Sequence, residues 1–171
     1  MQEDTEPILN RVAQSKLVTF NLEDYYPEGK RRKLDIKDWL HQGLILKEKE
    51  FRSYVEDHDW QQYKGDYVAL HCSTEAIVPG WAYMLISTKI QPYARQVIVG
   101  DLEELESVIY LAVLSELDLA PFKDKPVIIK GCSNKPVPQN AYLWAASKIR
   151  QVAKSVMYGE ACSSVPLYKR K

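Results

Sequence analysis

Short apolar segments alternate with helical segments along the chain from Tyr67 onward. Segments rich in β-branched and aliphatic residues predict strands at 67–71, 96–99, 126–130 and 155–158. The segments between them predict helices at 79–91, 102–117 and 138–153. Alternation of this kind favours right-handed βαβ crossovers, so we predict an α/β fold with a mainly parallel sheet and helices on both faces.

The N-terminal part has a different pattern. Residues 17–22 and 32–36 have strand composition and flank the turn signal Tyr26-Pro27-Glu28-Gly29, which predicts a hairpin. Residues 47–60 carry apolar side chains at helical spacing and predict one amphipathic helix. We expect a single domain over residues 1–171, with the hairpin and helix in residues 1–62 and a βαβ repeat core in residues 63–171.

The two outer βαβ segments resemble each other once a one-residue gap is placed after their first strands. Val78-Pro79 then matches Val137-Pro138, and Gly100-Asp101 matches Gly159-Glu160. Any two βαβ units can share such prolines and glycines, but a cysteine at the start of both loops is not required by the fold. We therefore predict an internal repeat in which Cys72 and Cys132 are structural equivalents, as are Asp101 and Glu160.

Three cysteines lie just beyond predicted strand ends. The carboxyl ends of parallel strands share one edge of a sheet, where open α/β folds bind their ligands. Thiolates suit zinc, copper(I) and iron–sulfur clusters. We predict a metal-binding or iron–sulfur-cluster accessory protein, holding zinc or a cluster at this edge. The candidate ligands are Cys72, Cys132 and Cys162, with Glu160 or Asp101 as the fourth donor and His71 as a weaker candidate.

Two alternatives stay open. Free cysteines often fill buried strand ends as small hydrophobic groups, and the protein would then be a non-catalytic interaction or oligomerisation module. A thiol-dependent enzyme would instead use Cys132 or Cys162 near a helix N-terminus, where a thiolate is stabilised. No residue is assigned a catalytic role, and a binding function is favoured over an enzyme.

The helix predicted at 102–117 motivates the interaction module. Asp101 is suited to its N-cap and Glu104 to the partner position of a capping box. The centre of this helix is apolar all round, so we expect it to be buried on more than one side, by the N-terminal segment or by a second subunit in a homodimer.

The amino-acid composition indicates which classes of partner and which cellular compartment to expect. Lysine plus arginine and aspartate plus glutamate both total 23, and this balance predicts binding to neither nucleic acid nor a membrane surface. The acidic start, the lack of an apolar run of about 18 residues and the odd number of cysteines predict a cytoplasmic protein with reduced thiols. No glycine-rich phosphate loop follows a predicted strand, so no nucleotide cofactor is expected.

Several segments resemble one known family. They are residues 10–15, 24–29, 44–49, 82–85 and 157–166, together with the cysteine segments. The chain is similar over nearly its whole length to a family of uncharacterised Bacteroidetes proteins, domain of unknown function 2480. That family carries no established activity. The resemblance implies a role in cluster or iron handling, with iron–sulfur assembly proteins as partners.

Overall fold

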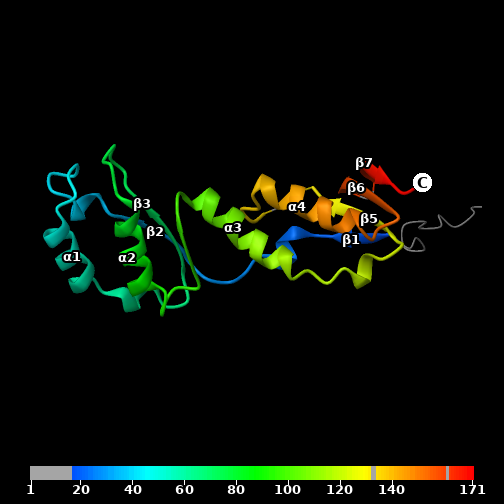
Figure 1. Cartoon of the computed structure of the whole chain (residues 1–171). Coiled ribbons are helices and arrows are strands. Elements are labelled where there is room, and N and C mark those ends of the chain that lie inside the picture. The colour runs from blue at the N-terminus through cyan, green and yellow to red at the C-terminus, as the bar shows by residue number, and fades with distance from the viewer. Residues whose placement is uncertain (1–16, 132–133, 161) are drawn as a thin grey trace, which may run out of the picture. The chain divides into compact units, whose positions relative to one another are not determined.

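The structure is a computed structural model that describes residues 17–131, 134–160 and 162–171 (Figure 1). Its contacts divide the chain into two units. The continuous unit holds residues 27–112, and the discontinuous unit holds residues 1–26 and 113–171. The assignment of one domain to the whole chain stays a prediction.

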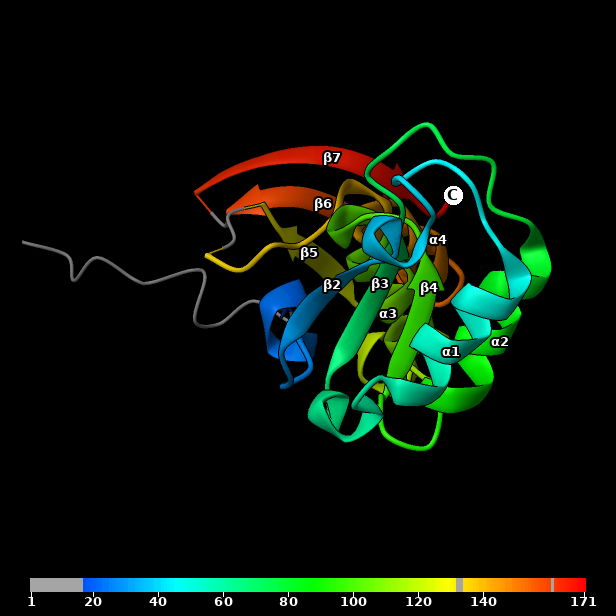
Figure 2. The same ribbon diagram turned by 90° about the vertical axis from the view of Figure 1, so that its left-hand side faces the viewer.

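The continuous unit is built on a parallel sheet with the order β2-β3-β4, seen side by side in Figure 2. Its elements are β2 (Arg31–Asp35), α1 (Glu48–Asp57), β3 (Tyr67–His71), α2 (Gly80–Ile90), β4 (Gln96–Val99) and most of α3 (Leu102–Ser115). Side chains of α1 and α2 cover the face of β3 that carries Val68 and Leu70. Leu105 and Ile109 of α3 cover the opposite face, so β3 is buried on both sides.

The discontinuous unit is built on a sheet with the order β1-β5-β6-β7. Its elements are β1 (Val18–Phe20), the end of α3, β5 (Pro126–Lys130), α4 (Gln139–Arg150), β6 (Ser155–Glu160) and β7 (Ser163–Lys169). The strands β1, β5 and β6 are parallel, whereas β7 pairs antiparallel with β6 at the edge. The mixed α/β class, the mostly parallel sheets and the flanking helices are therefore confirmed. None of the described helices is long and apolar enough to cross a membrane.

The predicted N-terminal hairpin is wrong. β1 pairs with β5 and β2 pairs with β3, so the two strands belong to different sheets, and each pairing is parallel. Each strand buries an apolar side chain, Phe20 or Leu34, beside a strand that is itself buried. Turn residues between two strands fix a local bend but not the partner of either strand. Burial beside a central strand decided the pairing.

The internal repeat is confirmed, and each unit contains one copy. Equivalent positions lie 59 residues apart (126 − 67), since Tyr67 pairs in register with Gln96 and Pro126 pairs with Ser155. At this spacing Gly131 corresponds to Cys72 (131 − 72), so the predicted equivalence of Cys72 and Cys132 does not hold. Hydrogen bonds repeat at the same spacing: Arg95 N–H donates to Asp66 C=O at 2.8 Å, and Lys154 N–H donates to Lys125 C=O at 2.9 Å. The helix positions that face the sheet also correspond, and all are fully buried: Ala82, Ile86 and Ile90 in α2, and Ala141, Ala145 and Ile149 in α4.

The start of α3 also agrees with prediction. Asp101 Oδ1 accepts hydrogen bonds from the N–H groups of Glu103 and Glu104 at 2.8 and 2.9 Å, and Glu104 Oε2 accepts from Asp101 N–H at 2.9 Å. This is the reciprocal pattern of a capping box. Farther along α3, Tyr110 and Leu114 are buried, whereas Leu111 is exposed.

Candidate functional site

The predicted metal ligands do not gather in the described residues. Cys72 follows β3 and is half-buried, with its Sγ 3.2 Å from Thr74 Oγ1. His71 is the last residue of β3 and lies in register with Asp35 of β2. Cys162 is exposed in the turn between β6 and β7. Cys132 lies outside the described residues.

The two predicted oxygen donors have separate structural roles. Asp101 caps α3, as described above. Glu160 is the exposed last residue of β6 and lies in register with Ser163 of β7. The predicted equivalence of Asp101 and Glu160 holds, because each follows a glycine with positive φ, Gly100 or Gly159. After these two residues the chain enters a helix in one unit and a strand in the other.

The predicted metal-binding function is therefore wrong. The described part of the chain contains no group of three or more His, Cys, Asp or Glu side chains that could hold a metal ion. The prediction assumed that all strand ends meet at one edge, but β3 and β6 belong to different sheets. The expectation of zinc or an iron–sulfur cluster as cofactor stays a prediction.

The thiol-enzyme alternative has no support at Cys162, which lies between two strands and not at a helix start. Cys72 is partly buried and packs against the hydrophobic core of the continuous unit. Burial, and then the nearby Cys72, raises the pKa of the Tyr83 hydroxyl above its usual value. These surroundings are those of a small hydrophobic side chain at a strand end.

A broad, open groove lies between the loops that follow β2 and β3. It encloses about 640 Å³ and is lined by Leu44, Ile45, Leu46, Glu48, Glu75, Ala76, Ile77, Pro79 and Trp81. Both loops leave the carboxyl ends of neighbouring parallel strands. This is the edge at which open α/β sheets bind ligands.

Local hydrogen bonds shape the first wall of the groove. His41 N–H donates to Ile45 C=O at 2.8 Å, which closes a tight turn. Gln42 and Gly43 in this turn both have positive φ. Thr74 Oγ1 donates to Gly43 C=O at 2.6 Å, and so joins the turn to the loop after β3.

A carboxylate also holds the loop after β3. Asp35 Oδ1 accepts hydrogen bonds from the N–H groups of Lys37 and Ser73, each at 3.1 Å. Burial alone raises the pKa of the Asp35 carboxyl, but hydrogen bonds from the Ser73 side chain and from these N–H groups, with the charge of His71, bring it below its usual value. The ionised form is thus favoured, and its hydrogen bond with Ser73 N–H fixes the start of the loop that carries Glu75, Ala76 and Ile77 of the groove.

The groove combines apolar walls with an acidic rim. Leu44 and Ile45 are each 57% exposed, and Ile77 is 92% exposed. Glu48 Oε1 accepts a hydrogen bond from Arg52 Nε at 2.9 Å, and the same guanidinium lies 5.3 Å from the centre of the Trp81 ring. Glu75 forms no ion pair with any described residue.

This groove was not predicted from the sequence. The signal was present in Leu44-Ile45-Leu46 and in Ile77, which are aliphatic residues in segments that join predicted elements. Residues in connecting loops are normally polar, so clustered aliphatic side chains there indicate either a core contact or an exposed binding surface. Only the three-dimensional arrangement shows that the two segments face one hollow.

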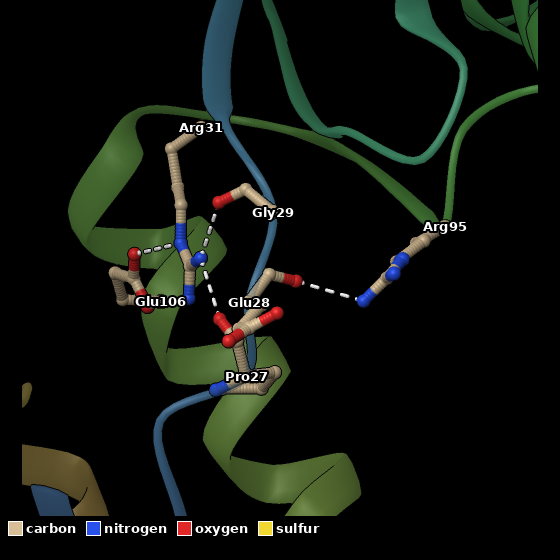
Figure 3. Close-up of polar contacts among 6 residues, drawn as sticks. All are labelled: Pro27, Glu28, Gly29, Arg31, Arg95 and Glu106. Atoms are coloured by element: carbon tan, nitrogen blue, oxygen red, sulfur yellow. Dashed lines mark hydrogen bonds and ion pairs between the residues drawn. The ribbon is translucent and has the colours of Figure 1, made fainter.

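Apart from the groove, the continuous unit contains a cluster of polar contacts, shown in Figure 3. It joins Arg31 to Glu106 and to the main chain before β2. Arg31 Nη1 donates to the C=O groups of Pro27 and Gly29 at 2.8 and 2.6 Å. Arg95 Nη1 donates to Glu28 C=O at 2.7 Å. Because Arg31 is already paired with the nearby Glu106, we assign this cluster a structural role.

Comparison with known proteins confirms the family resemblance. The family model described as "Protein of unknown function (DUF2480)" matches residues 6–170. No curated protein and no solved structure matches the chain. The comparison therefore attaches no activity, and the proposed function depends on the groove.

Proposed function

We propose that this chain, which belongs to the DUF2480 family of proteins of unknown function, is a non-catalytic docking module. Its groove binds a segment of a partner protein that presents aliphatic side chains flanked by lysine or arginine. The observation that carries the proposal is the exposure of Leu44, Ile45 and Ile77 around one hollow. Aliphatic side chains exposed singly are common, whereas a cluster around a concave surface is typical of a binding site.

The open form of the groove favours a protein segment over a small molecule. Small-molecule pockets bury roughly 70–90% of the ligand surface. This groove is broad and open to solvent, so a small molecule in it would keep much of its surface in water. A protruding apolar side chain of a partner needs no such enclosure, because the partner itself covers the opening.

The rim charges favour a basic partner over a second copy of this chain. Glu75 lacks an ion-pair partner among the described residues, and Glu48 forms a solvent-exposed ion pair with Arg52. Two copies that meet at this groove would bring Glu48 and Glu75 of each copy close together, and like charges across an interface oppose binding. A lysine or arginine beside the apolar anchor would pair with Glu75.

We place this module in the cytoplasm, where the free thiols of Cys72 and Cys162 suit a reducing compartment. The expectation of iron–sulfur assembly proteins as partners came from the family resemblance and stays a prediction apart from the groove. The expectation that the protein binds neither nucleic acid nor a nucleotide stays a prediction.

A peptide titration followed by amide NMR tests the proposal. The probes are two short acetylated and amidated peptides, one of leucine and lysine and one of leucine and glutamate. We expect the lysine peptide to shift the resonances of Leu44, Ile45, Ile77 and the Trp81 indole, and the glutamate peptide to bind at least about tenfold more weakly, a difference of about 1.4 kcal/mol.

Three variants complete the experiment. Leu44→Asp abolishes binding of the lysine peptide, and Glu75→Lys reverses the preference between the two peptides. Leu143→Asp, at a position 68% exposed on α4, leaves both affinities unchanged. Shifts scattered over the surface, or equal binding of both peptides, would exclude the groove as a docking site for a basic apolar segment.

A further inference from the structure

The two copies of the repeat differ at one edge of their sheets. In the discontinuous unit, β7 pairs antiparallel with the outer edge of β6. β4 is the equivalent of β6, since Gln96 and Ser155 hold the same place in their registers. Within the described residues, no strand covers the outer edge of β4. On such an edge strand, the N–H and C=O groups of every second residue point away from the sheet and form no hydrogen bond with a neighbouring strand.

Burial shows the effect of the missing strand. Val156 of β6 is fully buried, whereas its equivalent in β4, Val97, is only partly buried. Val99 at the end of β4 is 56% exposed. Tyr158, the equivalent of Val99 in β6, is 39% exposed beside β7. An antiparallel strand beside β4 would therefore bury Val97 and cover Val99 in part.

β4 also lacks the features that protect two of the other edge strands, β2 and β7, and resembles the three-residue edge strand β1 in this respect. β2, at the opposite edge of the same sheet, carries Arg32 and Lys33, and β7 carries Pro166 and Lys169. Charged residues and proline on edge strands prevent unwanted pairing. β4 reads Gln-Val-Ile-Val, with neither a charge nor a proline. Its edge is therefore chemically suited to pairing.

The residues around β4 are complementary to themselves in an antiparallel arrangement. Arg95 and Asp101 lie three residues on either side of Ile98 (98 − 95 and 101 − 98), and both are exposed. Antiparallel pairing centred on Ile98 places Val97 opposite Val99 of the other strand. Arg95 and Asp101 flank the paired strands, outside β4 itself, where Arg95 also donates to Glu28 C=O and Asp101 also caps α3. Their opposite charges attract across the contact.

We propose that β4 pairs antiparallel with β4 of a second copy of this chain, in a two-fold symmetric contact centred on Ile98. A two-fold axis perpendicular to the sheet makes two identical edge strands antiparallel. Val97 of each copy then contacts Val99 of the other copy. The contact joins two three-stranded sheets into one. It uses the edge of β4 and is independent of the groove proposed as the docking site.

Light scattering on size-fractionated protein tests the oligomeric state. We expect a dimer for the full chain and a dissociation constant raised at least about tenfold, or about 1.4 kcal/mol, by Val99→Lys. The matched control is Met84→Lys, at a position 69% exposed on α2 of the same unit, which leaves the dimer unchanged. Circular dichroism establishes that both variants are folded.

Hydrogen exchange on the unaltered chain provides a measurement that needs no variant. Outward-facing amides of β4 become protected as protein concentration rises, whereas amides of β2 do not. A monomer at every concentration would overturn the proposal. So would a dimer that Val99→Lys leaves intact, or one in which exchange at β4 does not depend on concentration.

Discussion

Arg31 and Glu106 form a nearly buried ion pair, in which Nε and Oε1 lie 2.6 Å apart and the side chains are 10% and 7% exposed. The same guanidinium binds the main-chain oxygens of Pro27 and Gly29 (Figure 3). Within the continuous unit, one side chain thus joins the segment that enters β2 to helix α3. Gly29 packs against the ring of Tyr67, where an added Cβ would be too close.

Disrupting the Arg31–Glu106 ion pair should lower the stability of the protein. We expect Glu106→Leu to lower the free energy of unfolding by about 3–5 kcal/mol, because it leaves the Arg31 charge buried without its partner. The double variant Arg31→Met with Glu106→Leu should lose less than the sum of the two single variants. Urea denaturation measures all three. Arg52→Met, which breaks the exposed pair with Glu48, is the control and should cost at most about 1 kcal/mol.

Gly100→Ala should destabilise the protein by about 1–3 kcal/mol. Gly100 has a φ of +148°, and an added Cβ would collide with the Glu104 carboxylate that caps α3. Gly80→Ala is the matched control, because a Cβ there meets no atom within 4 Å and the residue begins a helix. Differential scanning calorimetry compares the two. A Gly100→Ala protein as stable as Gly80→Ala would contradict the assigned role of Gly100.

His58 should make stability depend on pH. Its ring packs against Trp39 and Trp60 with centroids 5.1 and 4.6 Å apart, and its Nε2 lies 3.0 Å from Tyr63 Oη. Burial lowers the pKa of His58, and the nearby Asp59 opposes this only in part. The unfolded chain then binds a proton at His58 more readily than the folded chain. The contribution of neutral His58 to the free energy of unfolding is therefore complete above a pH of about 6.5, and it is lost as the pH falls toward the pKa of His58 in the folded protein.

Thermal melting at a series of pH values measures this effect. We expect the melting temperature of the unaltered chain to fall on acidification below a pH of about 6.5. His58→Gln should reduce that fall, because glutamine does not titrate. An identical pH profile for the variant would show that His58 is not responsible.

The cysteines should differ in reactivity. Cys162 is exposed in a turn, whereas Cys72 is half-buried and contacts Thr74. Alkylation requires access of the reagent to the sulfur atom, so Cys162 should react several-fold faster with iodoacetamide than Cys72. Peptide mass spectrometry after timed labelling separates the two sites, and the difference should vanish in denaturant. Equal rates in the folded protein would contradict the burial of Cys72.

Local sequence patterns were sufficient to locate most elements. The predicted strands at 96–99 and 126–130 coincide with β4 and β5, and the capping box at Asp101 and Glu104 forms as expected. β7 was not predicted, because Pro166 interrupts its pattern. The groove was not predicted either, because two separate loops must meet to form it, and Leu44 and Ile77 in these loops lie 33 residues apart in sequence (77 − 44).

The amino-acid sequence by itself determined the α/β class, the helix and strand positions in the repeat, and the equivalence of the two βαβ units. These depend on side-chain periodicity and on residues such as Gly100 and Pro79, which act within a few positions of themselves. Only the tertiary structure decided that β1 and β2 join different sheets, and that Cys72 and Cys162 follow strands of separate sheets. Strand pairing depends on burial against distant residues, and no local pattern contains that information.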